Sequence, residues 1–223
     1  MATLTFAEEI LLIALDDETG KFLPMGAQGL RYPLVGAVLM DLALRAKIHA
    51  DVEKVEVLDS TPTGEESLDG PLAEIAEESE EHGINEWLNR LMPRAEDVEA
   101  QALERLVARG ILRREERRFL WVFSGRRYPV IDNTEEKEVK RRIVDILLTD
   151  EAPRPRDIAL ISLVDACDLM GAILSTREVD NAALRVEQIR KLDVIGRAMT
   201  NAIRNLRVEI AKSMTAPGGF PYT

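Results

Sequence analysis

The chain has 223 residues, of which 46% are hydrophobic, and its net charge is -11 at pH 7. This composition can bury a full core, but no stretch of about twenty apolar residues is free of charges, which excludes a membrane-spanning helix. The acidic balance disfavours a nucleic-acid-binding domain, and a lone Cys167 excludes an internal disulfide. Glu8 and Glu9 precede the first apolar run, which is wrong for a secretory signal, so we expect a cytoplasmic protein peripheral to a membrane.

Helical periodicity dominates the first half of the chain. Thr5 and Glu8 make a capping-box pattern ahead of an apolar segment, and Pro33 is suited to the first turn of the next helix because it needs no hydrogen-bond partner for its nitrogen. The predicted elements are helices at 5–15 and 34–45, two short strands within 47–59, and helices at 67–80, 84–91 and 97–109.

The second half begins with a predicted β-hairpin. Two apolar pieces, 110–112 and 119–123, flank a charged turn at 113–118. Helices at 134–149, 156–175 and 178–213 should follow, the last of them broken near Asp193.

Charge is strongly segregated along the sequence. Residues 105–142 hold twelve Lys or Arg and six Asp or Glu, a net charge of +6, whereas residues 51–100 hold sixteen acids and three bases. A molecule polarised in this way should have one face that attracts anions and another that attracts cations.

Motifs for catalysis are missing from the sequence. His49 and His82 have no neighbouring ligands at metal-binding spacing, and nucleophile-elbow and phosphate-loop glycine patterns are absent. Asp165 and Asp168 lie three apart, and we expect them to cap a helix or to pair with arginines of a neighbouring helix. The sequence therefore predicts no enzyme activity, no metal and no cofactor.

The basic stretch allows three interpretations. Its arginines could pair with the protein's own acids. The order of a helix at 97–109 and a hairpin also resembles a winged-helix nucleic-acid-binding regulator, but Glu96, Asp97 and Glu99 would repel phosphate at the start of the recognition helix, so we expect no nucleic acid.

The third interpretation is a membrane-surface contact through the hairpin, in which each basic residue contributes about 1 kcal/mol. The same apolar strand could instead join two protomers, which would make the chain a purely oligomeric module. The residues expected to meet the membrane or a second protomer are Arg117, Arg118, Phe119, Leu120, Trp121, Arg126 and Arg127.

Several segments, in order, resemble the Golgi phosphoprotein 3 family of peripheral membrane adaptors, and bacterial members of it in particular. The matching segments are 8–17 with Gly20, 36–48, 61–64 with Leu68 and Asp69, 84–88, 104–112 and 158–174.

The resemblance implies a single all-α domain over 1–214, a helical bundle surrounded by amphipathic helices with a protruding β-hairpin, and a flexible tail at 215–223. It implies no catalysis and no cofactor. Eukaryotic relatives bind phosphatidylinositol 4-phosphate on Golgi membranes, together with cytoplasmic tails of glycosyltransferases and coat proteins. Their hairpin supports self-association and membrane contact, so a homo-oligomer is expected.

The lipid-site residues of the eukaryotic pattern are not retained. They align with Gly26, Val35, Glu96 and Glu99, and two of these positions carry the opposite charge. Arg31, Arg90 and Arg94 lie close enough in the sequence to offer a substitute site for a lipid headgroup. We therefore expect binding to an anionic phospholipid membrane surface, with basic cytoplasmic tails of membrane proteins as partners for the acidic 51–100 region.

Overall fold

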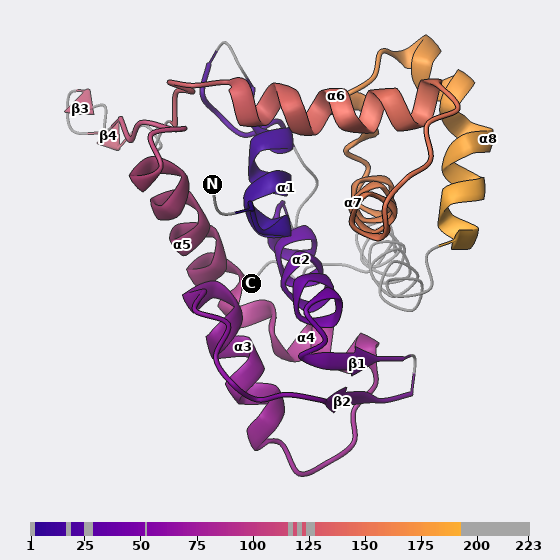
Figure 1. Ribbon diagram of the computed structural model, residues 1–223. Coiled ribbons are helices and arrows are strands. Elements are labelled where there is room, and N and C mark those ends of the chain that lie inside the picture. Colours follow the sequence, from indigo (N-terminus) through magenta and orange to yellow (C-terminus); the bar gives the residue numbers. More distant parts are fainter. Residues whose placement is uncertain are drawn as a thin grey trace, which may run out of the picture.

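The computed structural model describes residues 3–16, 19–24, 29–51, 53–115, 118–119, 122–123 and 128–192, with only the backbone at 118, 119, 122 and 123. The described chain is mostly helical, as predicted (Figure 1). Its elements are α1 (Phe6–Ala14), α2 (Arg31–Leu44), β1 (Ile48–Ala50), β2 (Val55–Val57), α3 (Glu66–Glu77), α4 (Ile84–Arg90), η1 (Met92–Arg94), α5 (Ala95–Ala108), β3 (Arg118–Phe119), β4 (Val122–Phe123), α6 (Thr134–Leu148), α7 (Pro155–Ala166), η2 (Met170–Ala172) and α8 (Thr176–Leu192).

The centre of the bundle is the pair α1 and α2. Every residue of α1 is buried, and α1 packs against α2, α5 and α6. Figure 1 shows α3 and α5 on one side of this pair, α7 and α8 on the other, and α6 crossing between them. The outer helices are amphipathic: α8 buries Ala182, Val186 and Ile189, which share one face at helical spacing. The predicted bundle with surrounding amphipathic helices is confirmed.

The capping box that opens α1 is also confirmed. The Glu8 amide donates to the Thr5 hydroxyl at 3.2 Å, and the Thr5 amide donates to the Glu8 carboxylate at 2.6 Å. The next helix begins earlier than predicted, at Arg31, because the Leu34 amide already bonds the Leu30 carbonyl at 2.9 Å. The two short strands are confirmed as an antiparallel pair in which Ile48 lies opposite Val57.

The hairpin forms, but its strands do not pair as predicted. Leu112 is bridged to Val130, and the tip pairs Arg118 with Phe123. Residues 113–115 and Arg118 therefore belong to one arm and not to a turn. The reason is burial: Leu112 is 1% exposed and belongs to the hydrophobic core, so it cannot pair with residues far out in the hairpin.

The helix predicted at 156–175 ends at Ala166, so the prediction of one long helix is wrong there. Asp168 adopts a left-handed φ of 60°, and the Leu169 amide bonds the Val164 carbonyl at 2.9 Å. This is the Schellman arrangement that closes many helices. Asp165 pairs with Arg190 of α8 at 4.0 Å, as expected of an acid beside a neighbouring helix. The predicted helix beyond residue 192 lies outside the described residues.

None of the helices in the described ranges is long and apolar enough to cross a bilayer.

Candidate functional site

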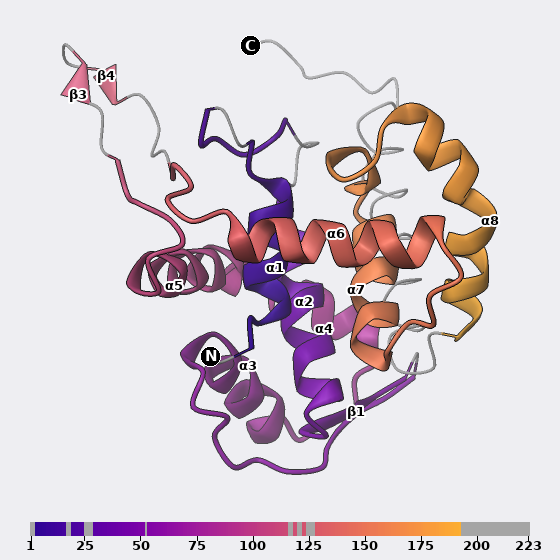
Figure 2. The ribbon, with the colours of Figure 1, turned by 45° about the horizontal axis from the view of Figure 1, so that its top comes forward.

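The hairpin stands away from the helical body. Its two arms leave the core at Leu112 and Val130, where the Arg113 amide donates to the Pro129 carbonyl at 2.9 Å. Figure 2 shows β3 and β4 at its far end, well separated from the labelled helices. A second anchor holds the returning arm, because the amide of the buried Tyr128 donates to the Gly20 carbonyl at 2.8 Å.

This second anchor predicts the effect of changing Gly20 to alanine. Gly20 has a φ of 62°, and a Cβ atom there would lie 2.9 Å from the Pro129 nitrogen. We expect Gly20→Ala to lower the free energy of unfolding by about 2–3 kcal/mol, because it adds a backbone clash to the cost of a left-handed residue. Gly64→Ala is the matched control, since Gly64 has a φ of 82° with nothing within 4 Å of the added atom.

Urea unfolding of both variants measures the difference. Gly64→Ala should cost only about 1 kcal/mol, the strain of the left-handed backbone alone. Equal losses in the two variants would show that the hairpin base is not packed against this turn.

The predicted contact residues of the hairpin remain a prediction. Arg118 and Phe119 lie in β3, where the backbone alone is described. The others, Arg117, Leu120, Trp121, Arg126 and Arg127, lie outside the described residues.

Arginines close to the base of the hairpin form ion pairs with the protein's own acids. This is the first of the three interpretations of the basic stretch. Their pairs are Arg105 with Glu8 and Glu65, Arg109 with Glu135, Arg113 with Glu115, Arg114 with Glu104, and Arg142 with Glu9 and Asp157. Each of these cations therefore has at least one carboxylate partner within the protein.

The three arginines expected to form a substitute headgroup site each meet a different carboxylate. Arg31 pairs with Glu96, and Arg94 pairs with Glu74 on α3. Arg90 pairs with Glu78 and lies over the Trp87 ring at 5.2 Å. The three guanidinium groups therefore point at three separate acids in this conformation.

Arg90 is also fixed by a histidine. Its Nη1 lies 2.6 Å from Nε2 of His82. Because a guanidinium can only donate, Nε2 must accept, and the proton of the ring then sits on Nδ1, which lies 2.9 Å from a Glu86 oxygen. The His82 ring thus links the segment before α4 to the helix itself.

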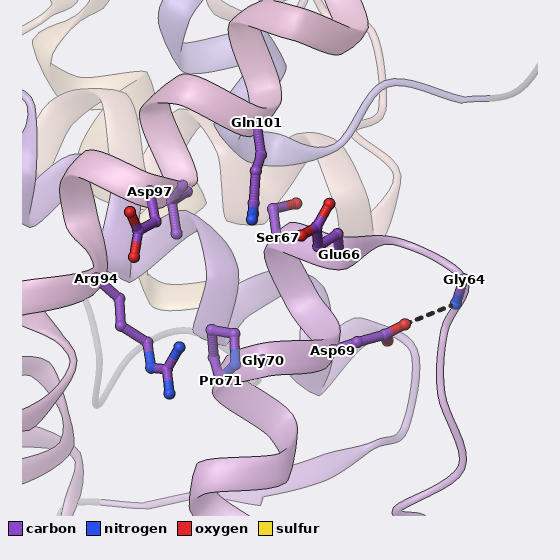
Figure 3. Close-up of a pocket in the computed structure, with 10 residues that line it drawn as sticks. Gly64, Glu66, Ser67, Asp69, Gly70, Pro71, Arg94, Asp97 and Gln101 are labelled. Carbon is purple, nitrogen blue, oxygen red and sulfur yellow. Dashed lines mark hydrogen bonds between the residues drawn. The ribbon is translucent and has the colours of Figure 1, made fainter.

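A pocket of about 390 Å³ lies between the start of α3 and the first turns of α5 (Figure 3). The carboxylates of Glu66, Asp69 and Asp97 outnumber the single guanidinium of Arg94. Asp69 is held by the amides of Thr63 and Gly64, at 2.6 and 3.2 Å. This lining repels a phosphate and suits a basic side chain.

A buried charge network, which sequence reasoning missed, ties α1 and α2 to α6 and α7. Glu9 accepts from Arg142 at 2.7 Å and from Arg156 at 2.8 Å. Asp41 accepts from the Phe6 amide at 2.6 Å and from Arg156 at 3.3 Å. Burial raises the pKa of both carboxyls, although Arg156 opposes that rise.

Comparison with known protein families matches most of the chain. The family model described as Golgi phosphoprotein 3 (GPP34) matches residues 6–206. The chain belongs to the Golgi phosphoprotein 3 family. The resemblance drawn from the sequence segments is therefore confirmed.

Two curated relatives of this Golgi phosphoprotein 3 family member are both named vacuolar protein sorting-associated protein 74. The one from Eremothecium gossypii is 29% identical over 213 residues, which cover 80% of this chain and 63% of that protein. The one from Schizosaccharomyces pombe is 30% identical over 165 residues, which cover 65% of this chain and 48% of that protein. The chain thus spans about half to two thirds of the length of these relatives.

The positions expected to align with the family's lipid site carry no basic residue in this chain. Val35 is 1% exposed and lies in the core, while Glu96 is exposed and holds Arg31. Gly26 lies outside the described residues.

Exposed Glu96 and Asp97 in the first turn of α5 also disfavour the winged-helix alternative, since that turn would face phosphates.

Proposed function

We propose that the chain is a non-enzymatic peripheral membrane protein that binds anionic lipid headgroups through the tip of the hairpin 112–130. The observation that carries the proposal is the projection of this hairpin away from the helices (Figure 2). Four arginines flank its apolar tip in the sequence: Arg117, Arg118, Arg126 and Arg127. Family membership supports the same role, because the curated relatives are named for vacuolar protein sorting, a process of membranes.

The binding free energy of such a membrane contact can be summed from the residues that make it. Four arginines near an anionic surface supply roughly 4 kcal/mol, at about 1 kcal/mol each. Phe119, Leu120 and Trp121 add the burial of one or two apolar side chains. The attachment should therefore be reversible and sensitive to salt.

Arg31, Arg90 and Arg94 are proposed as a secondary contact for a phosphoinositide such as phosphatidylinositol 4-phosphate. Their side chains are 50, 38 and 42% exposed. Exposed ion pairs are worth about 0–1 kcal/mol, so a phosphate can replace Glu96, Glu78 or Glu74 at little cost. Because three acids compete for these arginines, and Arg94 also lines the acidic pocket that repels a phosphate, Arg31 and Arg90 should carry most of this contact and selectivity for this lipid should be weak.

Sedimentation with vesicles tests the proposal. We expect the chain to pellet with phosphatidylserine vesicles at low salt and to be released as the Debye length shortens to about 8 Å at physiological salt. Neutral phosphatidylcholine vesicles should not pellet it. A folded chain that stays in solution with anionic vesicles at low salt would overturn the proposal.

An adaptor also needs a second surface, and we propose the acidic pocket between α3 and α5 as the place that receives basic cytoplasmic tails of membrane proteins. Replacing Glu66 by glutamine and Asp97 by asparagine should weaken binding of a Lys- and Arg-rich tail peptide by about tenfold, since each lost charge contributes on the order of 0.5–1 kcal/mol.

Fluorescence anisotropy with a labelled tail peptide measures this affinity. Glu104→Gln is the control, because Glu104 is an exposed acid of α5 that does not line the pocket. Equal affinity for the double variant and the parent chain would remove this surface from the proposal.

Self-association through the hairpin belongs to the same proposal, and deletion of 114–121 should then reduce the mass of the particle in solution.

A further inference from the structure

A second cavity lies at the C-terminal end of α2, on the other side of the segment 64–66 from the acidic pocket. It has a volume of about 650 Å³ and is bounded by the end of α2, the start of α7 and the segment before α1. In Figure 2 the start of α7 lies beside the end of α2, far from β3 and β4. Three arginines line it: Arg45, Arg154 and Arg156.

Arg156 is held rigidly at this cavity. Its Nη2 donates to the Leu4 carbonyl at 2.6 Å and to Glu9 at 2.8 Å, and its guanidinium carbon lies 4.1 Å from the centre of the Phe6 ring. Its Nε atom is buried and has no hydrogen-bond partner within the part of the chain that the structure describes. Its Nη atoms are already engaged by Asp41, Glu9 and the Leu4 carbonyl, so Arg156 forms a fixed wall of the cavity, and a direct contact with a ligand falls to the other two arginines.

Arg154 and Arg45 can move toward a ligand. Arg154 is exposed, and no ion pair between described residues involves its side chain. Arg45 reaches Asp41 only at 4.0 Å and is one-third exposed. Both guanidinium groups are therefore available to an anion beside Arg156.

Two carboxylates also border the cavity, but both are already engaged. Asp41 is 1% exposed and bonds the Phe6 amide beneath the arginines. Glu65 pairs with Arg105. The groups left for a ligand are thus cationic, and the positive end of the α7 dipole lies on the same side, since residues 154–156 open that helix.

We propose that this cavity binds a phosphate monoester group, carried by a soluble metabolite or by a lipid headgroup. Arginine forks match phosphate oxygens in pairs of parallel hydrogen bonds, so Arg45 and Arg154 together can hold a doubly charged phosphate beside Arg156. The cavity is larger than a phosphate ion and falls within the usual range for small-molecule sites, about 300–1,000 Å³, so it can also accept the group to which the phosphate is attached. The site is independent of the hairpin and of the proposed membrane contact.

Calorimetric titration of the full chain with inorganic phosphate and with glycerol 3-phosphate, in chloride buffers of equal ionic strength, tests the proposal. Arg154→Ala should weaken the binding of both by about tenfold or more, the loss of one charge-assisted contact, and Arg154→Lys should recover part of it. Arg141→Ala is the matched control, because Arg141 is an exposed arginine of α6 with a single carboxylate partner and does not line the cavity. Arg154 lies outside the buried network, so its variants should unfold at the same urea concentration as the parent chain.

Vesicles then identify the source of the phosphate. Weaker binding of Arg154→Ala to phosphatidate vesicles, with unchanged binding to phosphatidylglycerol vesicles, assigns a lipid headgroup, because only phosphatidate carries a monoester. A loss confined to the soluble phosphates assigns a metabolite. Failure of the parent chain to bind either soluble phosphate, or equal affinities for the parent and Arg154→Ala, would overturn the proposal and leave the hairpin proposal untouched.

Discussion

Replacing Asp41 by alanine should lower the free energy of unfolding by about 3–5 kcal/mol, the range measured when one partner is removed from a buried ion pair. Asp41 accepts the amide of Phe6 and the guanidinium of Arg156. Without Asp41, the buried Phe6 amide has no acceptor. Arg156 keeps its ion pair with Glu9 but loses one of its two carboxylate partners. Urea unfolding followed by circular dichroism measures the loss.

An exposed aspartate provides the matched control. Asp145 pairs with Arg141 one helical turn away at 3.8 Å, and both side chains are largely solvated. Asp145→Ala should therefore cost no more than about 0.5 kcal/mol. If both aspartates cost the same, the network does not hold the four helices together.

The pH dependence separates the charge of Asp41 from its hydrogen bond. Burial raises the pKa of Asp41 above its ordinary value of 3.8, so the folded chain keeps this proton at a pH where the unfolded chain has lost it. The stability due to this proton is complete below pH 3.8 and is lost as the pH rises through the higher folded pKa. Asp41→Asn keeps an acceptor for Phe6 and should flatten the stability profile in that window.

Replacing both Arg117 and Arg118 by alanine should weaken binding to phosphatidylserine vesicles by about 30-fold. The estimate follows from about 1 kcal/mol for each basic residue at an anionic surface, with about 1.4 kcal/mol for each factor of ten. Vesicle sedimentation at low salt measures the affinity. Unfolding by urea should not change, because the hairpin tip is remote from the core in Figure 2.

Arginines of the same hairpin closer to the body give the matched control. Arg113 pairs with Glu115 at 2.6 Å, and Arg114 pairs with Glu104 at 3.8 Å. Replacing this pair by alanine removes the same formal charge, and we expect less than about a threefold change in affinity, because these cations have internal partners. Equal effects of the two double variants would mean that net charge alone, and not the tip, attracts the membrane.

Helix ends show where sequence reasoning succeeds. Gly110 has a φ of 75° and follows α5, and the prediction of a helix end at Arg109 is correct because glycine marks a left-handed position. Asp168 holds the same position after α7, and Ala46 holds it after α2. Neither residue is a strong signal in a sequence, so the end of α7 was predicted far too late.

The candidate sites were harder to predict because they depend on contacts between distant segments. Glu9 and Asp41 lie within apolar helices, and an acid in such a position needs a buried cation. The sequence supplies that signal but does not say that Arg142 and Arg156, far along the chain, are the partners. The cavity beside Arg156 follows from the same packing and has no pattern of its own.

Fluorescence of Trp121 in the presence of brominated anionic lipid tests most directly whether the hairpin tip enters the membrane interface. Of the two tryptophans, Trp87 is 1% exposed and should be beyond reach of the quencher. We expect brominated phosphatidylserine vesicles at low salt to quench the parent chain and to leave Trp121→Phe unchanged. If the parent chain pellets with these vesicles but its emission is not quenched, the membrane contact is made elsewhere and the account is wrong.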